Sequence, residues 1–220
     1  MLNILFPKFC ATCTNVLISQ EELLCSYCLS ELPLTHFHQF NDHTMYDKFY
    51  GLLPIHQATA LLYFIKKGIT QKLLHKLKYE GQQNIGSYFG NWLGSELKQI
   101  PSYQNIQAVV PVPLHKKRLR TRGYNQVERF AQELAKHLQA EYCDESLLKI
   151  SAAKSQVTLG RWARFRTNEV FKLGNTDRIK NKHVLLVDDI ITTGATLVEC
   201  GKELLKAPVD KLSIATLAMS

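Results

Sequence analysis

Short apolar segments alternate with amphipathic helical patterns from residue 106 to the end of the chain. Three apolar segments are predicted strands, at 106–112, 184–187 and 212–218. Helical spacing of apolar residues predicts helices over 125–138 and from about 195 to 207, before Pro208. Apolar strands separated by helices are typical of a parallel sheet with helices on both faces. The sequence therefore predicts an α/β fold whose ligands bind beyond the carboxyl ends of the strands.

The residues before 106 predict fewer elements. An apolar run at 58–65 is a predicted buried strand, and apolar positions at 69, 73, 74 and 77 predict a helix over 69–79.

Two further features lie after residue 106. A strand is expected at 146–150, and Asn125 and Glu128 are placed as a capping pair at the start of the helix over 125–138. We expect two units: a small one over 1–40, and the α/β domain over 41–220.

Four of the six cysteines form two pairs with a two-residue gap, Cys10 with Cys13 and Cys25 with Cys28. Two such turns supply the four thiolates of a tetrahedral zinc site, and four thiolates leave no position open for catalysis. Two disulfides or a redox-active pair are the alternatives, although the first residues show no signal peptide and disulfides are favoured in secreted proteins. The spacing therefore favours a structural Zn²⁺ in an N-terminal zinc-finger unit.

Basic residues exceed acidic ones by 27 to 19, for a net charge of +8. The excess is concentrated at 116–122 and 161–182, and such clusters either bind phosphate groups or form solvated surfaces. The run at 58–65 is too short to span a membrane. We therefore expect a cytoplasmic protein without a membrane span.

The segment 184–196 carries the clearest chemistry. A buried strand delivers adjacent carboxylates, Asp188 and Asp189, to its expected end, and small or hydroxyl-bearing residues then lead into a helix. Those residues are Thr192, Thr193, Gly194, Ala195 and Thr196. Backbone N–H groups in such a loop bind phosphate, and the carboxylates can accept hydrogen bonds from the 2′ and 3′ hydroxyls of a ribose. The alternative is an aspartate pair that ends a core strand before an ordinary helix cap.

This segment resembles the phosphoribosyl pyrophosphate (PRPP) signature of type I phosphoribosyltransferases. The resemblance implies that fold, PRPP as ligand, and Mg²⁺ bound together with the pyrophosphate. It also implies that the two acids hold the ribose while the loop holds its 5′-phosphate.

The paired cysteines and the segments 77–81, 110–115 and 118–126 resemble the ComF (GntX-like) competence proteins over nearly the whole chain. That resemblance implies a role in natural transformation, in which the protein handles incoming single-stranded DNA in the cytoplasm, with a helicase-like DNA-uptake translocase as a candidate partner. By analogy, His115 and Lys116 belong to the PRPP site. Segment 156–171 resembles the mobile loop of the family.

Further basic and aromatic residues are candidates for binding pyrophosphate or nucleic acid: Lys117, Arg118, Arg120, Arg122, Tyr124, Arg161, Arg164 and Arg166. Tyr124, Trp162 and Phe165 lie among these charges, so their rings either stack on bases or pack in the interior.

Thr192 stands where purine-salvage relatives have an acidic general base, and a hydroxyl cannot serve as a base near neutral pH. The sequence therefore predicts PRPP binding more strongly than turnover. An active phosphoribosyltransferase acting on an unidentified acceptor is the alternative. A zinc-finger DNA-binding regulator is weaker, because it leaves the aspartates without a role.

Overall fold

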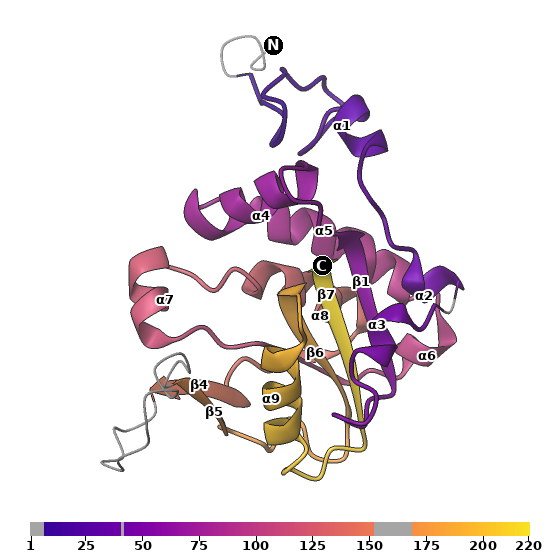
Figure 1. The fold of residues 1–220 in the computed structure, drawn as a ribbon, viewed down its shortest axis with the longest axis vertical. Helices are drawn as coiled ribbons and strands as arrows, with labels where there is room; N and C mark the ends of the chain where they lie inside the picture. The colour runs from indigo at the N-terminus through magenta and orange to yellow at the C-terminus, as the bar shows by residue number, and fades with distance from the viewer. Residues whose placement is uncertain (1–6, 41, 152–168) are drawn as a thin grey trace.

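The computed structural model describes residues 7–40, 42–151 and 169–220. Within them, a five-stranded parallel sheet has the strand order β1-β7-β6-β2-β3 (Figure 1). Its strands are β1 (Gln57–Tyr63), β2 (Ala108–Pro111), β3 (Glu141–Tyr142), β6 (His183–Ile191) and β7 (Lys211–Met219). The predicted parallel sheet is confirmed, and β6 lies at its centre.

The helices differ widely in length. The long ones are α4 (Ile69–Tyr79), α5 (Asn84–Leu97), α8 (Glu128–Leu138) and α9 (Ala195–Leu204). The short ones are α1 (Ser26–Ser30), α2 (Phe37–Phe40), α3 (Thr44–Asp47), α6 (Pro101–Gln104) and α7 (Lys116–Arg122). Helix α4 has the predicted bounds, whereas α8 begins three residues later than expected.

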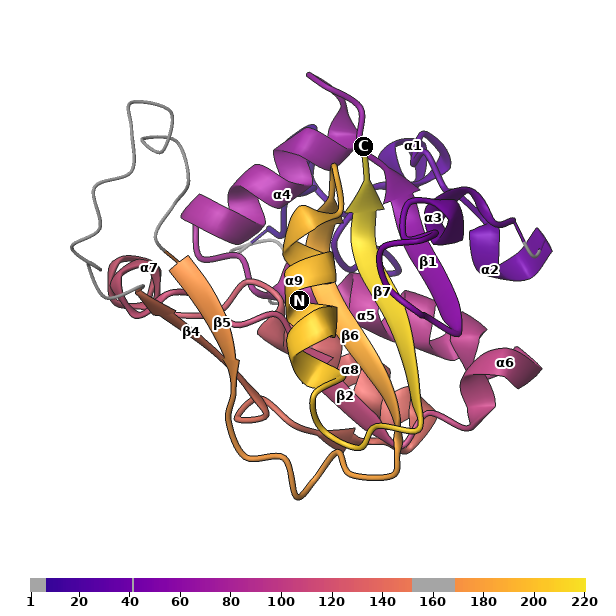
Figure 2. The same ribbon diagram turned by 60° about the horizontal axis from the view of Figure 1, so that its bottom comes forward.

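Both faces of the sheet are covered, as Figure 2 shows. Leu185 and Val187 of β6 pack in an apolar cluster with residues of α4, α5 and α8. Val184 and Leu186 pack in a second cluster with residues of α9. Successive side chains of a strand point to opposite faces, so this alternation divides the core into two layers.

Sequence reasoning missed helix α5, which packs against α8. Its glycines at 86, 90 and 94 are weak helix formers. A Cβ atom at Gly90 would lie 2.7 Å from the carbonyl oxygen of Phe130, so only glycine permits this approach of the two helices. Packing of an apolar face therefore stabilises a helix that local propensity disfavours.

Asn125 forms its half of the expected capping pair, since its Oδ1 accepts a hydrogen bond from the N–H of Val127 at 3.3 Å, although α8 begins later, with Val127 as its N-cap residue. The Asn125 side chain also donates a hydrogen bond from Nδ2 to the carbonyl oxygen of Val112, at 3.0 Å. The residue thus ties the segment before α8 to the end of β2.

The expected strand at 146–150 forms outside the main sheet. β4 (Leu147–Ser151) pairs with β5 (Glu169–Leu173) as an antiparallel hairpin, which lies on the α7 side of the molecule in Figures 1 and 2.

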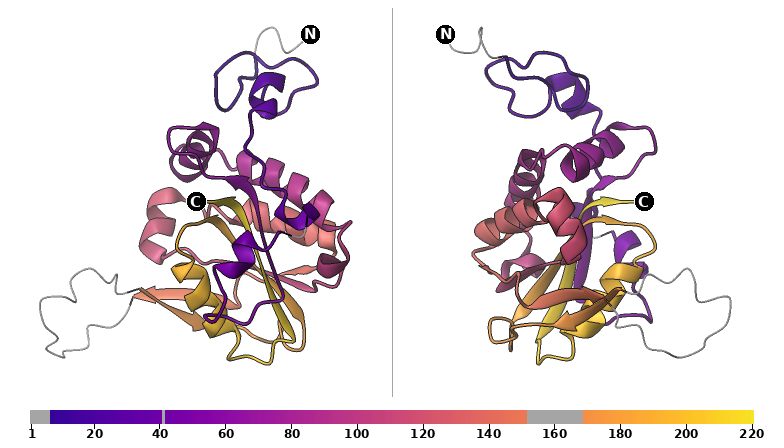
Figure 3. Two further views of the ribbon diagram at one scale, coloured as in Figure 1. Left: turned by 45° about the vertical axis from the view of Figure 1, so that its right-hand side comes forward. Right: turned by 90° about the vertical axis from the view of Figure 1, so that its left-hand side faces the viewer.

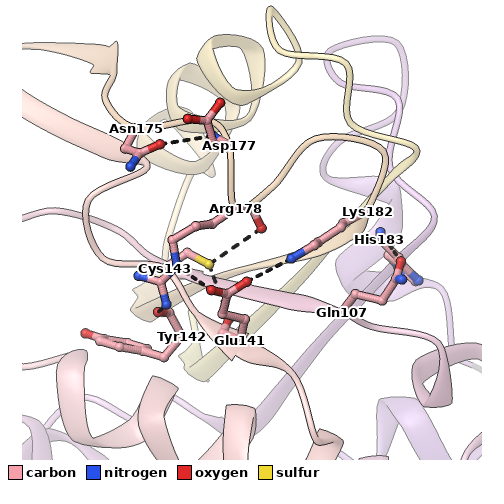
Figure 4. A network of polar contacts seen from close by, with 9 residues as sticks. All are labelled: Gln107, Glu141, Tyr142, Cys143, Asn175, Asp177, Arg178, Lys182 and His183. Carbon is pink, nitrogen blue, oxygen red and sulfur yellow. Dashed lines mark hydrogen bonds and ion pairs between the residues drawn. The ribbon is translucent and has the colours of Figure 1, made fainter.

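Strand β3 has only two residues, and charged side chains hold it at the sheet edge (Figure 4). Glu141 forms ion pairs with Arg178 and with Lys182, the latter at 2.8 Å. Arg178 also donates to the carbonyl oxygen of Tyr142 at 2.8 Å. The segment that leads into β6 is thereby fastened to β3.

Residues 7–30, which include α1, lie at one end of the molecule, and their buried apolar side chains belong to the same cluster as those of α4, α5 and α8 (Figure 3). The chain that follows joins the sheet at β1, where the backbone N–H of Thr35 donates to the Leu61 carbonyl oxygen at 3.0 Å and the backbone N–H of Tyr63 donates to that of Pro33 at 2.7 Å. In the described part of the chain, no helix is long and apolar enough to cross a bilayer.

Candidate functional site

Strand β6 continues to Ile191, past the end predicted at Val187. Asp188 and Asp189 therefore lie within the strand, where Asp188 is level with Thr216 of β7. Hydrogen bonding to β7 extends β6 beyond Val187 and past both aspartates. A prediction based on apolar runs ends the strand where the charged residues begin. The two carboxylates point to opposite faces of the sheet: Asp188 borders the start of α9, and Asp189 pairs with Lys78 of α4.

Asp188 is 8% exposed, and its Oδ1 accepts a hydrogen bond from the backbone N–H of Asp189 at 2.8 Å. Burial and the nearby charge of Asp189 raise the pKa of Asp188 from 3.8 to about 8. A carboxyl group with such a pKa exchanges its proton near neutral pH. Strongly shifted carboxyl groups of this kind are concentrated at functional sites.

Asp189 is 4% exposed and faces Lys78, the penultimate residue of α4. The Lys78 Nζ atom lies 2.9 Å from Asp189 Oδ2. Sequence reasoning gave Lys78 no site role, although it noted the segment 77–81 that contains it. The ion pair joins residues 111 positions apart (189 − 78), so only the fold shows the contact.

The loop after β6 has the geometry of an anion site. Gly194 adopts φ +81° and is the N-cap residue of α9, which begins without a side-chain cap bond. The Thr193 Oγ1 atom accepts from the N–H of Ala195 at 3.4 Å. Asp188 and residues 190–197 line a small pocket, which we call the loop pocket. The amino-terminal end of α9, a helix of ten residues, borders this pocket. The partial positive charge at that end favours the binding of a phosphate group.

Lys48 approaches the loop pocket from another element. Its Nζ donates to the carbonyl oxygens of Thr192 and Ser220, both at 3.3 Å. This lysine, which follows α3, was also missed by sequence reasoning. It places a positive charge beside the loop.

A larger cavity of about 700 Å³, the α4–α7 pocket, lies between the end of α4 and α7. The residues that line it are Lys78, Tyr79, Gly81, Lys117, Arg118, Thr121, Arg122 and Tyr124. Four of them are basic and none is acidic. Because Lys78 lines this pocket and pairs with Asp189, the pocket adjoins the carboxylates.

The predicted basic residues of 115–122 form the short helix α7, which has no buried residue. His115 caps it, since its Nδ1 accepts from the N–H of Lys117 at 3.2 Å. Lys117, Arg118 and Arg122 line the α4–α7 pocket, whereas Lys116 and Arg120 are exposed outside its lining. Arg161, Arg164 and Arg166, like Trp162 and Phe165, lie outside the described residues.

Of the two roles expected for the Tyr124 ring, stacking on bases and packing in the interior, the structure shows the second. It is 8% exposed, and its hydroxyl donates to the carbonyl oxygen of Leu77. The ring therefore anchors the chain after α7 to the end of α4. The exposed ring of the α4–α7 pocket belongs to Tyr79, which is 68% exposed.

The four paired cysteines converge in the N-terminal unit. Their Sγ atoms all lie within 4.8 Å of one another, and those of Cys13 and Cys25 are 3.6 Å apart. Four sulfurs around a tetrahedral zinc stand roughly 3.8 Å apart, given Zn–S bonds of about 2.3 Å. All six cysteines are free, and the N–H of Cys25 donates to Cys10 Sγ at 3.4 Å. This cluster could hold a zinc ion.

Comparison with known proteins agrees with the predicted resemblance. Residues 128–219 match the phosphoribosyl transferase domain family, so the match includes β6, its acids and the loop. DNA utilization protein YhgH of Escherichia coli K12 is 29% identical over 61% of this chain and 60% of its own length.

Two competence proteins are also similar. Competence protein F of Haemophilus influenzae is 32% identical over 51% of this chain, and competence protein ComFC of Streptococcus pneumoniae is 33% identical over 56%. The chain spans half the length of each. The resemblance to ComF-family competence proteins that contain a phosphoribosyltransferase domain is confirmed.

Proposed function

We propose that this protein binds PRPP at the carboxyl end of β6 and acts in natural transformation. One observation carries the proposal: two buried aspartates stand near the end of β6, two residues before the loop that leads into the amino-terminal end of α9. This arrangement provides oxygen acceptors for ribose hydroxyls beside a site for the 5′-phosphate.

The two faces of β6 suggest how the sugar lies. Asp188 borders the loop pocket, and Asp189 faces the α4–α7 pocket through Lys78. A ribose that lies across the end of β6 can donate hydroxyl protons to both acids. Its 5′-phosphate then occupies the loop formed by Thr192, Thr193, Gly194, Ala195 and Thr196, and its pyrophosphate extends toward His115 and Lys116.

Mg²⁺ fits this arrangement. The ion binds oxygen ligands and is commonly held by substrate phosphates together with one or two carboxylates. Because the two side chains point to opposite faces of the sheet, one of the two carboxylates, together with the phosphate oxygens, would supply the ligands. Bound there, the ion would offset the negative charge of the pyrophosphate.

We propose binding rather than turnover. Thr192 follows the acids where a general base would stand, and its hydroxyl does not ionise near neutral pH. Incubation with PRPP, Mg²⁺ and candidate acceptors tests the point, since a transferase releases pyrophosphate. Sustained release that depends on one acceptor would favour an enzyme instead.

The transformation role rests on the competence relatives and on the charge of α7. That helix carries five basic residues and no acidic one: Lys116, Lys117, Arg118 and Arg120, which are exposed, and Arg122, which is half-buried. A basic surface of this kind attracts the phosphates of incoming single-stranded DNA, and this role places the protein in the cytoplasm beside a helicase-like translocase. The four cysteines serve this function indirectly, by folding the N-terminal unit around a structural zinc.

Thr193→Glu tests the phosphate assignment. Thr193 is exposed, and a carboxylate at the start of α9 favours the helix, so the variant is expected to fold. Its charge would repel the 5′-phosphate, and calorimetry should show PRPP affinity at least tenfold below that of the wild type. The Thr193→Val variant, which adds no charge, should lose much less. Equal PRPP affinity in the glutamate variant and the wild type would contradict the assignment.

A further inference from the structure

We propose that the α4–α7 pocket binds one nucleotide of single-stranded DNA, with the base stacked on Tyr79. This inference rests on the proposed function, because it assigns a binding site to the single-stranded DNA that this function requires. It adds a site, a stacking residue and a position next to the ribose-binding acids.

The size of the pocket fits a nucleotide. At about 700 Å³ it lies within the usual range for small-molecule sites, roughly 300–1,000 Å³. A pyrophosphate group alone would leave much of this volume to solvent. The pocket also opens to the surface beside the exposed helix α7, so a strand can continue past it on either side.

The charge of the pocket suits a phosphodiester. Lys117 and Arg118 stand on α7, and Lys78 stands opposite them on α4. No acidic residue lines the pocket, and the carboxylate of Asp189 next to it is paired with Lys78, so the lining remains basic. We assign the phosphate of the bound nucleotide to Lys117 and Arg118, the two cations on the exposed side.

Tyr79 supplies a feature that pyrophosphate would not use. Tyr79 is 68% exposed although the guanidinium carbon of Arg122 lies over its ring, 5.4 Å from the centroid, and the His75 ring centroid is 5.1 Å away, so a base would stack on the part of the ring that stays open. Arg122 also donates to Gln126, which restrains it. A ring beside a guanidinium plane is the usual surface on which an unpaired base stacks.

The walls of the pocket are held together. The Tyr124 hydroxyl bonds to the Leu77 carbonyl oxygen, so the residues after α7 are tied to the end of α4. Tyr79 and the cations of α7 therefore face one another before any ligand binds. A site organised in advance loses less conformational entropy on binding.

Binding of a short fluorescein-labelled oligothymidylate, followed by anisotropy, tests the site. Stacking contributes about 1–3 kcal/mol per base, so Tyr79→Leu should weaken binding by roughly fivefold or more. Tyr79→Phe keeps the ring and should stay close to wild type. Tyr50→Leu is the matched control, because Tyr50 is also a highly exposed tyrosine (83%) but lines a different pocket.

Crosslinking locates the contact directly. An oligothymidylate that carries 5-iododeoxyuridine should crosslink, on irradiation, to the tryptic peptide that begins at Tyr79. Crosslinks confined to other peptides, together with wild-type affinity in Tyr79→Leu, would overturn the inference.

PRPP calorimetry on the same variants separates this inference from the proposed function. If Tyr79→Leu binds both PRPP and DNA as the wild type does, the pocket assignment fails and PRPP binding stands. If the wild type binds DNA but not PRPP, the proposed function fails and the effect of Tyr79 still decides the inference. Binding of inorganic pyrophosphate but not of oligothymidylate would identify a pyrophosphate pocket and overturn the inference.

Discussion

Lys78 on α4 and Asp189 on β6 form an ion pair, with Nζ and Oδ2 2.9 Å apart. The lysine side chain is 23% exposed and the aspartate side chain 6%. The pair balances a buried charge and ties the end of α4 to the carboxyl end of the central strand. The Lys78 charge also acts on the neighbouring acid, where it lowers the pKa of Asp188 against the larger effects of burial and of Asp189.

Replacing Lys78 by methionine should destabilise the fold. The substitution leaves the buried Asp189 carboxylate unpaired, and because Lys78 is partly exposed we expect a loss of about 1–3 kcal/mol, below the usual 3–5 for a fully buried pair. Urea denaturation at pH 8 measures the free energy of unfolding. Lys78→Arg keeps the charge and should lose less. A methionine variant as stable as the wild type would show that the pair stabilises nothing.

Asp188→Asn should raise stability while it weakens PRPP binding. The pKa of Asp188 is raised from 3.8 to about 8 in the folded protein, so folding favours the protonated form. The stability that this group contributes is therefore fully present below pH 4 and is lost as pH rises to about 8. Asparagine carries no charge and keeps an oxygen for the Asp189 N–H.

Thermal unfolding at several pH values checks this prediction. The Asp188→Asn variant and the wild type should differ little near pH 4, and the variant should be more stable at pH 9. One pKa unit corresponds to about 1.4 kcal/mol, so a gain on the order of a few kcal/mol is expected. A stability difference that does not change with pH would contradict the raised pKa.

Elemental analysis should find one zinc ion per chain, since one group of four cysteines was found in the described residues. Cys25→Ser should lose the metal and leave the N-terminal unit open to proteolysis, because so small a unit depends on its ion to fold. Cys200→Ala removes a thiol from the core below α9 and should retain the zinc. Wild-type protein purified without any zinc would refute the assignment.

Replacing Lys116, Lys117 and Arg118 together by alanine should weaken DNA binding and flatten its salt dependence. Each phosphate contact contributes about 0.7 to the slope of log affinity against log salt for single strands, so three contacts predict a fall of roughly 2. Alanine at Lys98, Lys202 and Lys211 removes the same charge from exposed positions elsewhere. If both triple variants change the slope equally, net charge and not α7 determines binding.

Local patterns were sufficient to predict the framework of the fold. Apolar runs and helical stripes identified β1, β2, β6, β7, α4, α8 and α9, because each buries a continuous face. Helix α5 was missed because its glycines act through contact with α8, which no local pattern shows. Local patterns predicted β4 as a strand, but they could not show that it pairs with β5 and not with a strand of the main sheet.

The candidate site was predicted in part. The acids and the loop are adjacent in sequence, so their chemistry could be recognised directly. Lys48, Lys78 and Tyr79 reach the site from distant elements, and residue type alone does not show that Tyr79 is exposed and Tyr124 buried. Tertiary contacts decide which of two similar side chains can meet a ligand.

Calorimetric titration with PRPP, in the presence and absence of Mg²⁺, tests the central claim most directly. The wild type should bind PRPP at one site, more tightly with Mg²⁺. The double variant Asp188→Asn, Asp189→Asn should show no measurable binding while its circular dichroism spectrum matches that of the wild type. PRPP binding of equal affinity in the double variant and the wild type would contradict the claim that these two carboxylates hold the ribose.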